Sequence, residues 1–437
     1  MIDVKLLREN PEKFKKAIAA KQADPKLIDD FLAVDEGWKK LVRELDDMRA
    51  WQKKLGEEKK IDEAKALKEQ IKSREVTLEE LDGRRSGILK RIPNPPLDTV
   101  PTGSDESGNV TLREVGKRPV FKFKPKDYID IAESLNLIDT ERAGKVSGSR
   151  FGYLLNETVR LEFALAQFAL ATLTDKKAVG KLIKQNKLNI PNFPFVPVVP
   201  PVLIKKEMME GMGYVERGSD EIYFLPKDDL YLVGTSEQSI GPMHSGEILS
   251  EDELPKRYLG FSTCFRREAG SYGKDTKGIL RVHQFDKLEM FSITKPEWSA
   301  EEHKLLLVIE EHLTSSLGLC FKVLSNCAGE LGDPAAAKYD IETWMPGQQG
   351  GKGEYRETSS TSNTTDFQSR RLGVKFRKKD GASELTHMLN GTAFAIGRTL
   401  IAILENYQRE DGSVVVPKVL QKYAGIKEIK PSKRRVL

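Results

Sequence analysis

Residues 265–289 read FRREAGSYGKDTKGILRVHQFDKLE. Both of its ends have strand-like composition and carry Arg and Glu, and the loop between them is rich in Gly, Lys and Asp. The pattern predicts a β-hairpin. Such a hairpin would direct Arg266 and Arg281 at phosphate groups and offer the ring of Phe285 to a nucleobase. An Arg–Glu pair on a strand is more often a surface ion pair, so the pair alone leaves both interpretations open.

The sequence on both sides of the hairpin indicates an α+β fold. The predicted strands are 193–201, which is extended and rich in proline, 222–225, 230–233, 257–267, 284–293 and 321–325. The predicted helices are 127–135, 158–186, 299–317 and 391–407. Because the strands lack a regular βαβ alternation, we predict an antiparallel β-sheet flanked by helices.

The N-terminal region carries a heptad pattern. Large apolar residues alternate in steps of four and three over residues 27–55, and the pattern resumes over residues 64–88 after a polar connection at 56–60. Arg74 and Arg85 fill two of the steps. Two heptad helices joined by a tight connection must fold back antiparallel, and at ~1.5 Å per residue each would be about 40–45 Å long.

This coiled-coil arm is expected over about residues 27–90. Heptads alone leave open whether it is a dimerisation or spacer coiled coil or has another role, and its outward charges of both signs are typical of a solvated face. Residues 92–108 are rich in Pro, Gly and acidic residues, and no helix can cross them. We therefore expect two domains, residues 1–110 with the arm and residues 111–437 with the sheet.

Composition argues against several classes of protein. The chain has 437 residues, with 71 Lys and Arg against 66 Asp and Glu, so its net charge of +5 is a weak argument for a polyanionic partner. No stretch is long and apolar enough to span a bilayer, and residues 1–10 lack the apolar run of a secretory signal, so we expect a cytoplasmic protein without membrane contact. The three cysteines have no C-x-x-C spacing, so structural zinc is not expected. Walker, G-x-G-x-x-G, H-E-x-x-H and G-x-S-x-G motifs are all absent.

Longer motifs carry a specific resemblance. Residues 265–289 resemble motif 2 of the class II aminoacyl-tRNA synthetases. Residues 391–408, GTAFAIGRTLIAILENYQ, look like motif 3, which is a strand-to-helix unit. The predicted helix 158–186 and the strand that ends at Pro200-Pro201 are similar to motif 1, the loosest of the three. In detail, nearly the whole chain, arm included, resembles the bacterial type of seryl-tRNA synthetase.

The resemblance implies ATP-dependent attachment of L-serine to serine tRNA through seryl-adenylate, with Mg²⁺ as cofactor. It also implies a homodimer, an arm that grips the long variable arm of serine tRNA across the dimer, and selenocysteine tRNA as a further acceptor. Two alternatives remain. An amino-acid-adenylating ligase for a non-tRNA acceptor would lack the arm, and a non-catalytic RNA-binding protein with a synthetase fold would have lost the catalytic arginines.

The resemblance further implies the site residues. The serine site would consist of Thr235, Ser236, Glu237, Arg266, Glu289, Asn390 and Thr392. The ATP site would consist of Arg266, Arg267, Glu268, Arg281, Val282, His283, Gln284, Phe285, Glu357, Thr358, Ser359, Ser360 and Arg398. The catalytic residues would be Arg266, Glu268, Arg281 and Arg398, and the Mg²⁺ ligands Glu357 and Ser360.

Within these sets, Glu289 with Glu237 beside it would meet the serine ammonium, and Asn390 and Thr392 its hydroxyl. On composition alone, the Ser- and Thr-rich run of residues 355–363 is typical of a loop. Positions within this run and within motif 3 depart from the family pattern, and we expect those differences to tune serine affinity without changing the assignment. The positions are Thr358, Thr361 and 392–394.

Overall fold

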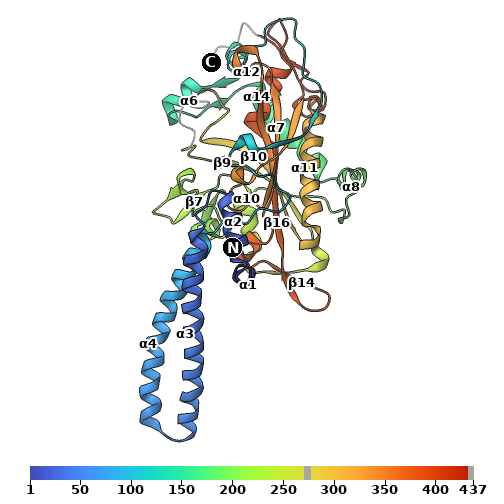
Figure 1. Cartoon of the computed structure of the whole chain (residues 1–437). Helices are drawn as coiled ribbons and strands as arrows, with labels where there is room; N and C mark the ends of the chain where they lie inside the picture. The colour runs from blue at the N-terminus through green and yellow to red at the C-terminus, as the bar shows by residue number, and fades with distance from the viewer. Residues whose placement is uncertain (270–276, 432–437) are drawn as a thin grey trace. The chain divides into compact units, whose positions relative to one another are not determined.

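The computed structural model describes residues 1–269 and 277–431. The chain divides into two compact units, Met1–Pro96 and Leu97–Leu437 (Figure 1). The middle of the predicted hairpin loop, residues 270–276, lies outside the described residues.

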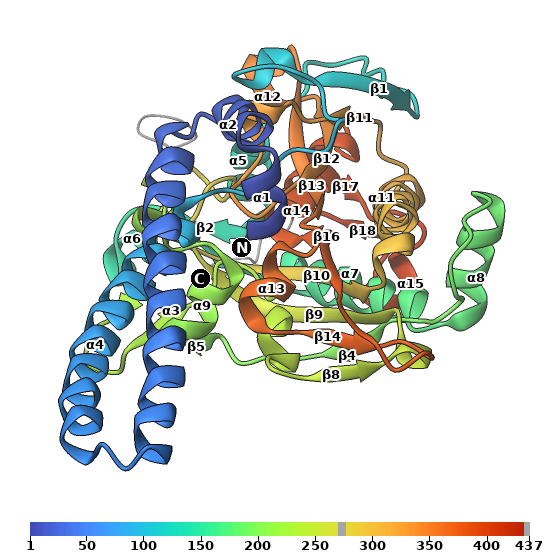
Figure 2. The same ribbon diagram turned by 60° about the horizontal axis from the view of Figure 1, so that its bottom comes forward.

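The first unit is helical. Two short helices, α1 (Val4–Glu9) and α2 (Pro11–Ala20), precede two long ones, α3 (Lys26–Glu57) and α4 (Ile61–Arg91). The long helices lie side by side and run in opposite directions (Figures 1 and 2), which confirms the predicted antiparallel arm. Between them the chain reverses at Lys59, whose φ of 58° lies in the left-handed region.

The seam between α3 and α4 is made by the predicted heptad positions. Leu41, Leu45 and Ile71 are buried at its centre. The apolar side chains packed against them are Met48, Leu67, Leu78 and Leu81. Burying one Leu or Ile side chain contributes on the order of 1.5–3 kcal/mol, so packing along this seam stabilises helices that would be marginal in isolation.

One heptad position is filled by Arg85, and this residue joins a buried ion cluster. Its Nε donates a hydrogen bond of 2.7 Å to Asp35, and its guanidinium lies 4.7 Å from the ring centroid of Trp38. Arg8 of α1 donates two hydrogen bonds of 2.7 Å to the same carboxylate, which is 2% exposed. Burial works against ionisation of Asp35, but the hydrogen bonds from both arginines outweigh it and lower its pKa to about 2. The cluster therefore ties α1, α3 and α4 together at one end of the arm.

The second unit is built on a large sheet. In its described residues, eight strands pair in the order β1-β11-β12-β13-β16-β10-β9-β4. All neighbours are antiparallel except β4 and β9, so the predicted antiparallel-rich sheet is confirmed. These strands are β1 (Val110–Val115), β4 (Val196–Val198), β9 (Lys256–Phe265), β10 (Gln284–Thr294), β11 (Phe321–Ser325), β12 (Ala337–Met345), β13 (Glu354–Asn363) and β16 (His387–Ala395).

Helices cover this sheet and enclose its main hydrophobic core (Figure 2). The α-helices described in this unit are α5 (Tyr128–Leu135), α6 (Thr140–Ser147), α7 (Glu157–Leu173), α8 (Lys176–Gln185), α9 (Lys206–Met212), α10 (Glu237–Ile240), α11 (Ser299–Ser316), α12 (Gln348–Gly351), α13 (Phe367–Leu372), α14 (Ile396–Asn406) and α15 (Gln421–Ala424). Helix α11 packs on β16 and β13, α14 on β12 and β10, and α7 on β9 and β16. Among residues 1–269 and 277–431, no helix is both long and apolar enough to cross a bilayer.

Shorter strands surround the main sheet. They are β2 (Ile138–Asp139), β3 (Tyr153–Leu154), β5 (Leu203–Lys205), β6 (Phe224–Leu225), β7 (Leu230–Leu232), β8 (Ile248–Ser250), β14 (Lys375–Arg377), β15 (Ser383–Leu385), β17 (Val414–Val415) and β18 (Glu428–Ile429). Strands β5, β7 and β6 form a separate small sheet, and so do β15, β14 and β8.

Two predicted helices have the wrong bounds. The helix predicted over 158–186 is interrupted, because Asp175 starts a new helix, α8, by accepting a hydrogen bond from the amide of Lys177. The helix predicted over 391–407 begins only at Ile396, since the residues before it form β16. This second boundary agrees with the strand-to-helix unit that the motif 3 resemblance implied.

Two extended segments also differ from the prediction. The Ser- and Thr-rich run of 355–363, typical of a loop by composition, lies in strand β13, because β12 and β16 pair with it on both sides. Within the proline-rich segment 193–201, only β4 pairs with the sheet. Its proline at position 197 fits there, since β4 lies at the sheet edge.

The ion cluster in the arm makes a testable prediction. Asp35→Asn should destabilise α3 and α4 by about 2–3 kcal/mol at pH 7, because Arg8 and Arg85 lose the carboxylate whose pKa they lower. Since the pKa of Asp35 is lowered on folding, its contribution is complete above about pH 4 and is lost as the pH falls through 2. Hydrogen–deuterium exchange of peptides from residues 26–91 measures the effect.

The matched control is Asp29→Asn, which changes an exposed aspartate of the same helix that pairs with Lys15. Its exchange rates should stay close to those of the unmodified protein. Equal protection of residues 26–91 in both variants would contradict the structural role of the cluster.

Candidate functional site

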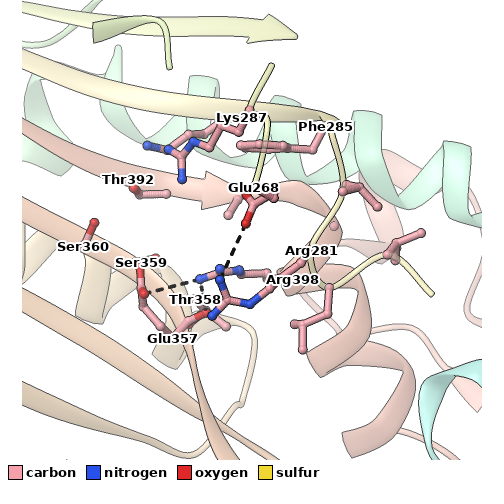
Figure 3. A pocket seen from close by; sticks show the side chains of 16 residues that line it. Glu268, Arg281, Phe285, Lys287, Glu357, Thr358, Ser359, Ser360, Thr392 and Arg398 are labelled. Carbon is pink, nitrogen blue, oxygen red and sulfur yellow. Dashed lines mark hydrogen bonds and ion pairs between the residues drawn. The ribbon is translucent and has the colours of Figure 1, made fainter. Parts of the chain in front are cut away.

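A pocket opens over the middle of the main sheet (Figure 3). Its walls come from β10, β13, β16 and the first turn of α14, with residues that join β9 to β10. They are Arg266, Glu268, Ile279, Leu280, Arg281, Val282, Phe285, Lys287, Glu357, Thr358, Ser359, Ser360, Thr392, Ala395, Gly397 and Arg398.

A second cavity adjoins the first and extends toward α10. Its walls include Tyr214, Thr235, Glu237, Gln238, Lys338, Ser362 and Asn390. Several charged residues line both cavities, namely Arg266, Glu268, Arg281, Lys287, Glu357 and Arg398. The two cavities are therefore parts of one site and share its charged lining.

Strand register explains how distant residues reach this site. Glu289 of β10 lies opposite Thr392 of β16, and Asn390 of β16 lies opposite Ser362 of β13. Because side chains alternate between the faces of a strand, residues 390 and 392 share a face, and so do residues 287 and 289. The pairing of β10 with β16 has a bulge between Leu288 and Glu289, and this shift in register sets Thr392 opposite Glu289.

Arg266 is held at the end of β9 by two contacts. Its Nε donates a hydrogen bond of 3.1 Å to the carbonyl of Gly234, and its guanidinium lies 5.3 Å from the ring centroid of Phe285. The backbone amide of Arg266 donates to the carbonyl of His283, which fixes the exit from β9 against the entry to β10. The guanidinium is thus directed into the pocket from a rigid base.

Two further arginines carry internal carboxylate partners. Nη1 of Arg281 lies 3.6 Å from a carboxylate oxygen of Glu268 (Figure 3). The backbone of Glu268 has a left-handed φ of 51°. Nη1 of Arg398 donates a hydrogen bond of 2.9 Å to the carbonyl of Glu357 and lies 3.5 Å from its carboxylate. Enclosure works against ionisation of Glu357, but nearby positive charges, Arg398 first among them, outweigh it and lower its pKa to about 2.

The second cavity has an acidic end. Glu237, at the start of α10, accepts hydrogen bonds of 2.8 Å from the Tyr214 hydroxyl and 3.1 Å from the Gln368 amide. Burial and the negative charge of Glu289 raise the pKa of Glu237 to about 7. Glu289 is 1% exposed and forms an ion pair with Lys287. The second cavity thus adds acidic groups near α10 to the arginines that line both cavities.

Most of the residues that the sequence assigned come together in these walls. They are Thr235, Glu237, Arg266, Glu268, Arg281, Val282, Phe285, Glu357, Thr358, Ser359, Ser360, Asn390, Thr392 and Arg398. Their chemical roles stay predictions.

The remaining assigned residues lie outside the two walls. Ser236 is fully buried against β9, where Gly260 leaves it room, since a Cβ at that position would lie 2.6 Å from its Oγ. Glu289 is 1% exposed and forms its ion pair with Lys287. His283 hydrogen-bonds the carbonyl of Arg266 over 2.9 Å. The other two are Arg267, with its guanidinium over the ring of Tyr223, and Gln284, which lines a neighbouring cavity.

Sequence reasoning missed several polar residues of the site. Lys287 lines both cavities, while Tyr214 and Gln368 hold Glu237 in place. Lys287 could have been found, because it lies two residues before Glu289 and therefore on the same face of a strand. No comparable signal marks Tyr214 and Gln368, which come from elements distant in sequence.

Family models match both units of the chain. The tRNA synthetase class II core domain (G, H, P, S and T) matches residues 224–407. The seryl-tRNA synthetase N-terminal domain matches residues 1–96.

Known proteins resemble the chain over its full length. The serine–tRNA ligase of Acidothermus cellulolyticus is 45% identical, over 99% of this chain and 100% of that protein, and that of Dictyoglomus turgidum is 43% identical over the same shares. A crystal structure of seryl-tRNA synthetase from Pyrococcus horikoshii complexed with ATP superposes with a TM-score of 0.89 at 40% identity, covering 99% of this chain and 100% of that one. The cytoplasmic serine–tRNA ligase from Naegleria fowleri in complex with AMP gives 0.86 at 35% identity, covering 99% of each chain.

The raised pKa of Glu237 makes a testable prediction about stability. Its ordinary value is 4.5 and its folded value about 7, so folding binds a proton between these values and stability falls as pH rises through the window. Glu237→Gln keeps the acceptor oxygen and cannot ionise. The quantity to compare is the unfolding free energy of Glu237→Gln minus that of the unmodified protein. Between pH 5 and pH 8, this difference should rise by on the order of 2 kcal/mol.

Urea unfolding at the two pH values measures this shift. Glu207→Gln, at an exposed position of α9, is the control and should give the same difference at both pH values. A difference for Glu237→Gln that does not change with pH would contradict the prediction.

Proposed function

The chain belongs to the seryl-tRNA synthetase family, and on that premise we propose that it attaches L-serine to serine tRNA in two steps through seryl-adenylate. The observation that carries the proposal is one continuous site in which three arginines line the first cavity and also border the second, and in which the second adds the carboxylate of Glu237. We call the first the arginine-lined cavity and the second the acid-lined cavity. Phosphates require the first kind of lining and an amino acid's ammonium the second.

In the first step, a serine carboxylate oxygen attacks the α-phosphorus of ATP in line. The new O–P bond forms as the bond to the leaving pyrophosphate breaks, and the carboxylate is already ionised, so no protein base is required. Arg266, held from behind by Gly234 and Phe285, is in place to neutralise charge that develops at the α-phosphate. Arg281 and Arg398 would hold the outer phosphates, and we assign the γ-phosphate to Arg398.

The acid-lined cavity suits serine in chemistry. Glu289 and Glu237 would meet the ammonium, and Asn390 and Thr392 would meet the hydroxyl. An alanine in a site built for a hydroxyl leaves polar groups unpaired, at a cost on the order of 1–3 kcal/mol per group. Rejection of alanine therefore follows from hydrogen bonding.

Mg²⁺ fits the arginine-lined cavity only together with phosphates. Among the described residues, no group of three or more His, Cys, Asp and Glu side chains could hold a metal ion by itself. Glu357 and Ser360 offer one ionised carboxylate and one hydroxyl, which suits an ion that completes its shell with water and substrate oxygens. When bound there, Mg²⁺ would supply positive charge against the phosphate oxygens. Glu357 would also keep Arg398 oriented.

In the second step, the 3′-hydroxyl of the terminal tRNA adenosine attacks the carbonyl carbon of seryl-adenylate. The ester bond forms as the bond to phosphate breaks, and AMP leaves. We propose that residues 1–110 are the tRNA-binding domain, with the arm on the long variable arm of serine tRNA, and that residues 111–437 are the catalytic domain. The active form would be a cytoplasmic homodimer, and selenocysteine tRNA a further acceptor.

The presence of the arm disfavours the first alternative, an adenylating ligase without tRNA. Helices α3 and α4 are complete, and the family model that covers them is the one of tRNA-charging relatives. Arg266, Arg281 and Arg398 all line the pocket, which disfavours the second alternative, a non-catalytic RNA-binding protein.

The proposed reaction is tested by exchange of pyrophosphate into ATP and by tRNA charging. Exchange should require serine, and esterification should select serine tRNA out of total tRNA. Arg266→Ala should lower kcat of exchange by about 100-fold or more, since it removes a donor aimed at the developing charge. Exchange without charging would favour the ligase, and tRNA binding without exchange would favour the non-catalytic protein.

Deleting residues 27–90 tests the division of labour between the units. Exchange should stay nearly intact, because the pocket lies entirely within the second unit. Charging should be lost, because the arm supplies the tRNA contacts. Equal loss of both activities, in a variant whose circular dichroism shows a folded second unit, would refute this assignment.

A further inference from the structure

A buried lysine occupies the acid-lined cavity. Lys287 of β10 is 7% exposed, and its Nζ forms an ion pair with a carboxylate oxygen of Glu289. The same Nζ donates a hydrogen bond of 3.4 Å to the hydroxyl of Thr235. Glu289 is 1% exposed, so this pair is almost completely removed from water. A buried ion pair is weak evidence for stability and requires another explanation.

The partners of Lys287 indicate what that explanation is. Glu289 and Thr235 are both residues that we assign to the serine site under the proposed function, and Glu289 is the one assigned to the ammonium. The lysine head group is itself a primary ammonium, with three donors and one positive charge. Lys287 therefore presents to these two residues the same chemical group that a bound amino acid would present.

Lys287 also has a second place to go. It lines the arginine-lined cavity as well as the acid-lined one (Figure 3), and its flexible four-carbon stem lets the head group turn while the backbone stays in β10. On the phosphate side it would join Arg266, which lines the same two cavities. A displaced lysine would thus add a cation where ATP binds.

We propose that Lys287 is an internal stand-in for the substrate ammonium, and that serine displaces it from Glu289 toward the phosphate side of the site. The displacement couples the two substrates, since serine delivers a cation to the ATP cavity. The same exchange discriminates against ligands that lack an ammonium, because such ligands leave the lysine on Glu289. This inference rests on the proposed function and adds to it a positioning residue and an order of events.

The charges of the site support this exchange. Before serine binds, Lys287 neutralises Glu289, and Glu237 has a pKa raised to about 7 by burial and by Glu289. After serine binds, two ammonium groups are present, and Glu237 supplies the second carboxylate close by. The cavity can therefore hold the new cation without expelling the old one from the site.

Isothermal titration of the unmodified full chain with a non-hydrolysable ATP analogue tests the coupling. Saturating serine should tighten analogue binding by roughly 5- to 20-fold. Serinamide, which has the ammonium and lacks the carboxylate, should also tighten it, and glycerate, which has the carboxylate and lacks the ammonium, should not. Tightening by glycerate, or no tightening by serine, would overturn the inference.

Lys287→Met tests the residue itself. Without the internal cation, serine alone should bind several-fold more tightly, and its effect on the ATP analogue should fall to nearly nothing. If the role of Lys287 were purely structural, the Lys287→Met substitution would instead weaken serine binding and leave the coupling unchanged. That result would overturn the inference. If the variant does not fold, the comparison of serine, serinamide and glycerate on the unmodified protein still decides.

The matched control is Lys295→Met. Lys295 follows β10 directly, is 8% exposed, and pairs with Glu251 and Glu297 at 2.9 Å, away from both cavities. Its loss should leave serine binding and the coupling unchanged, and a loss of coupling there would also overturn the inference. Failure of the unmodified protein to exchange pyrophosphate with serine would refute the proposed function, whereas exchange without coupling would refute this inference alone.

Discussion

Two ladders of backbone hydrogen bonds, one on each side of β10, determine where Lys287 and Glu289 lie in the site. On one side β10 pairs with β9, and on the other with β16. The first ladder sets Arg266 beside the entry to β10, and the second sets Thr392 opposite Glu289. Since a slip of one residue would turn each side chain to the other face, the whole pocket depends on this register.

Several charged side chains of the site already form ion pairs within the protein. Arg281 has Glu268, Arg398 has Glu357, and Lys287 has Glu289 as internal partners. Internal partners hold these long side chains in place and reduce the entropy that substrate binding would otherwise cost. A substrate that binds here therefore replaces ion pairs within the protein by ion pairs with itself. Its affinity depends on the difference in free energy between these two sets of contacts.

Sequence patterns predicted the elements whose cause is local. Heptads fix the arm because the helical period acts over neighbouring turns, and the alternating ends of residues 265–289 fix the hairpin strands. The break before α8 was missed, since it depends on a single capping aspartate inside an otherwise helical pattern. Strand β13 was missed because its Ser and Thr side chains are typical of loops, and only its two neighbours make it a strand.

For the site, motif spacing predicted the residues that line the pocket but not the contacts among them. The hydrogen bonds of Glu237 join it to residues 23 and 131 positions away, and no periodicity links such distant positions. Lys287 was missed for a different reason, since a strand lysine is usually exposed and its burial appears only in the folded chain. Arg85, which looked like an interruption of the heptads, proved to be the partner of Asp35.

That ion cluster also has a mechanical consequence. A long helical hairpin held at one end bends like a cantilever, with the largest bending moment near the clamp and the largest deflection at the tip. Arg8, Asp35 and Arg85 brace three helices near the clamped end, while the seam farther out is made by Leu and Ile contacts. Because salt screens buried ion pairs much less than exposed ones, the bracing by Asp35 should persist at high ionic strength. The exposed pairs Arg49–Glu75 and Arg74–Glu44, which join α3 and α4 farther out, should weaken, so added salt should loosen the arm along its shaft before its root.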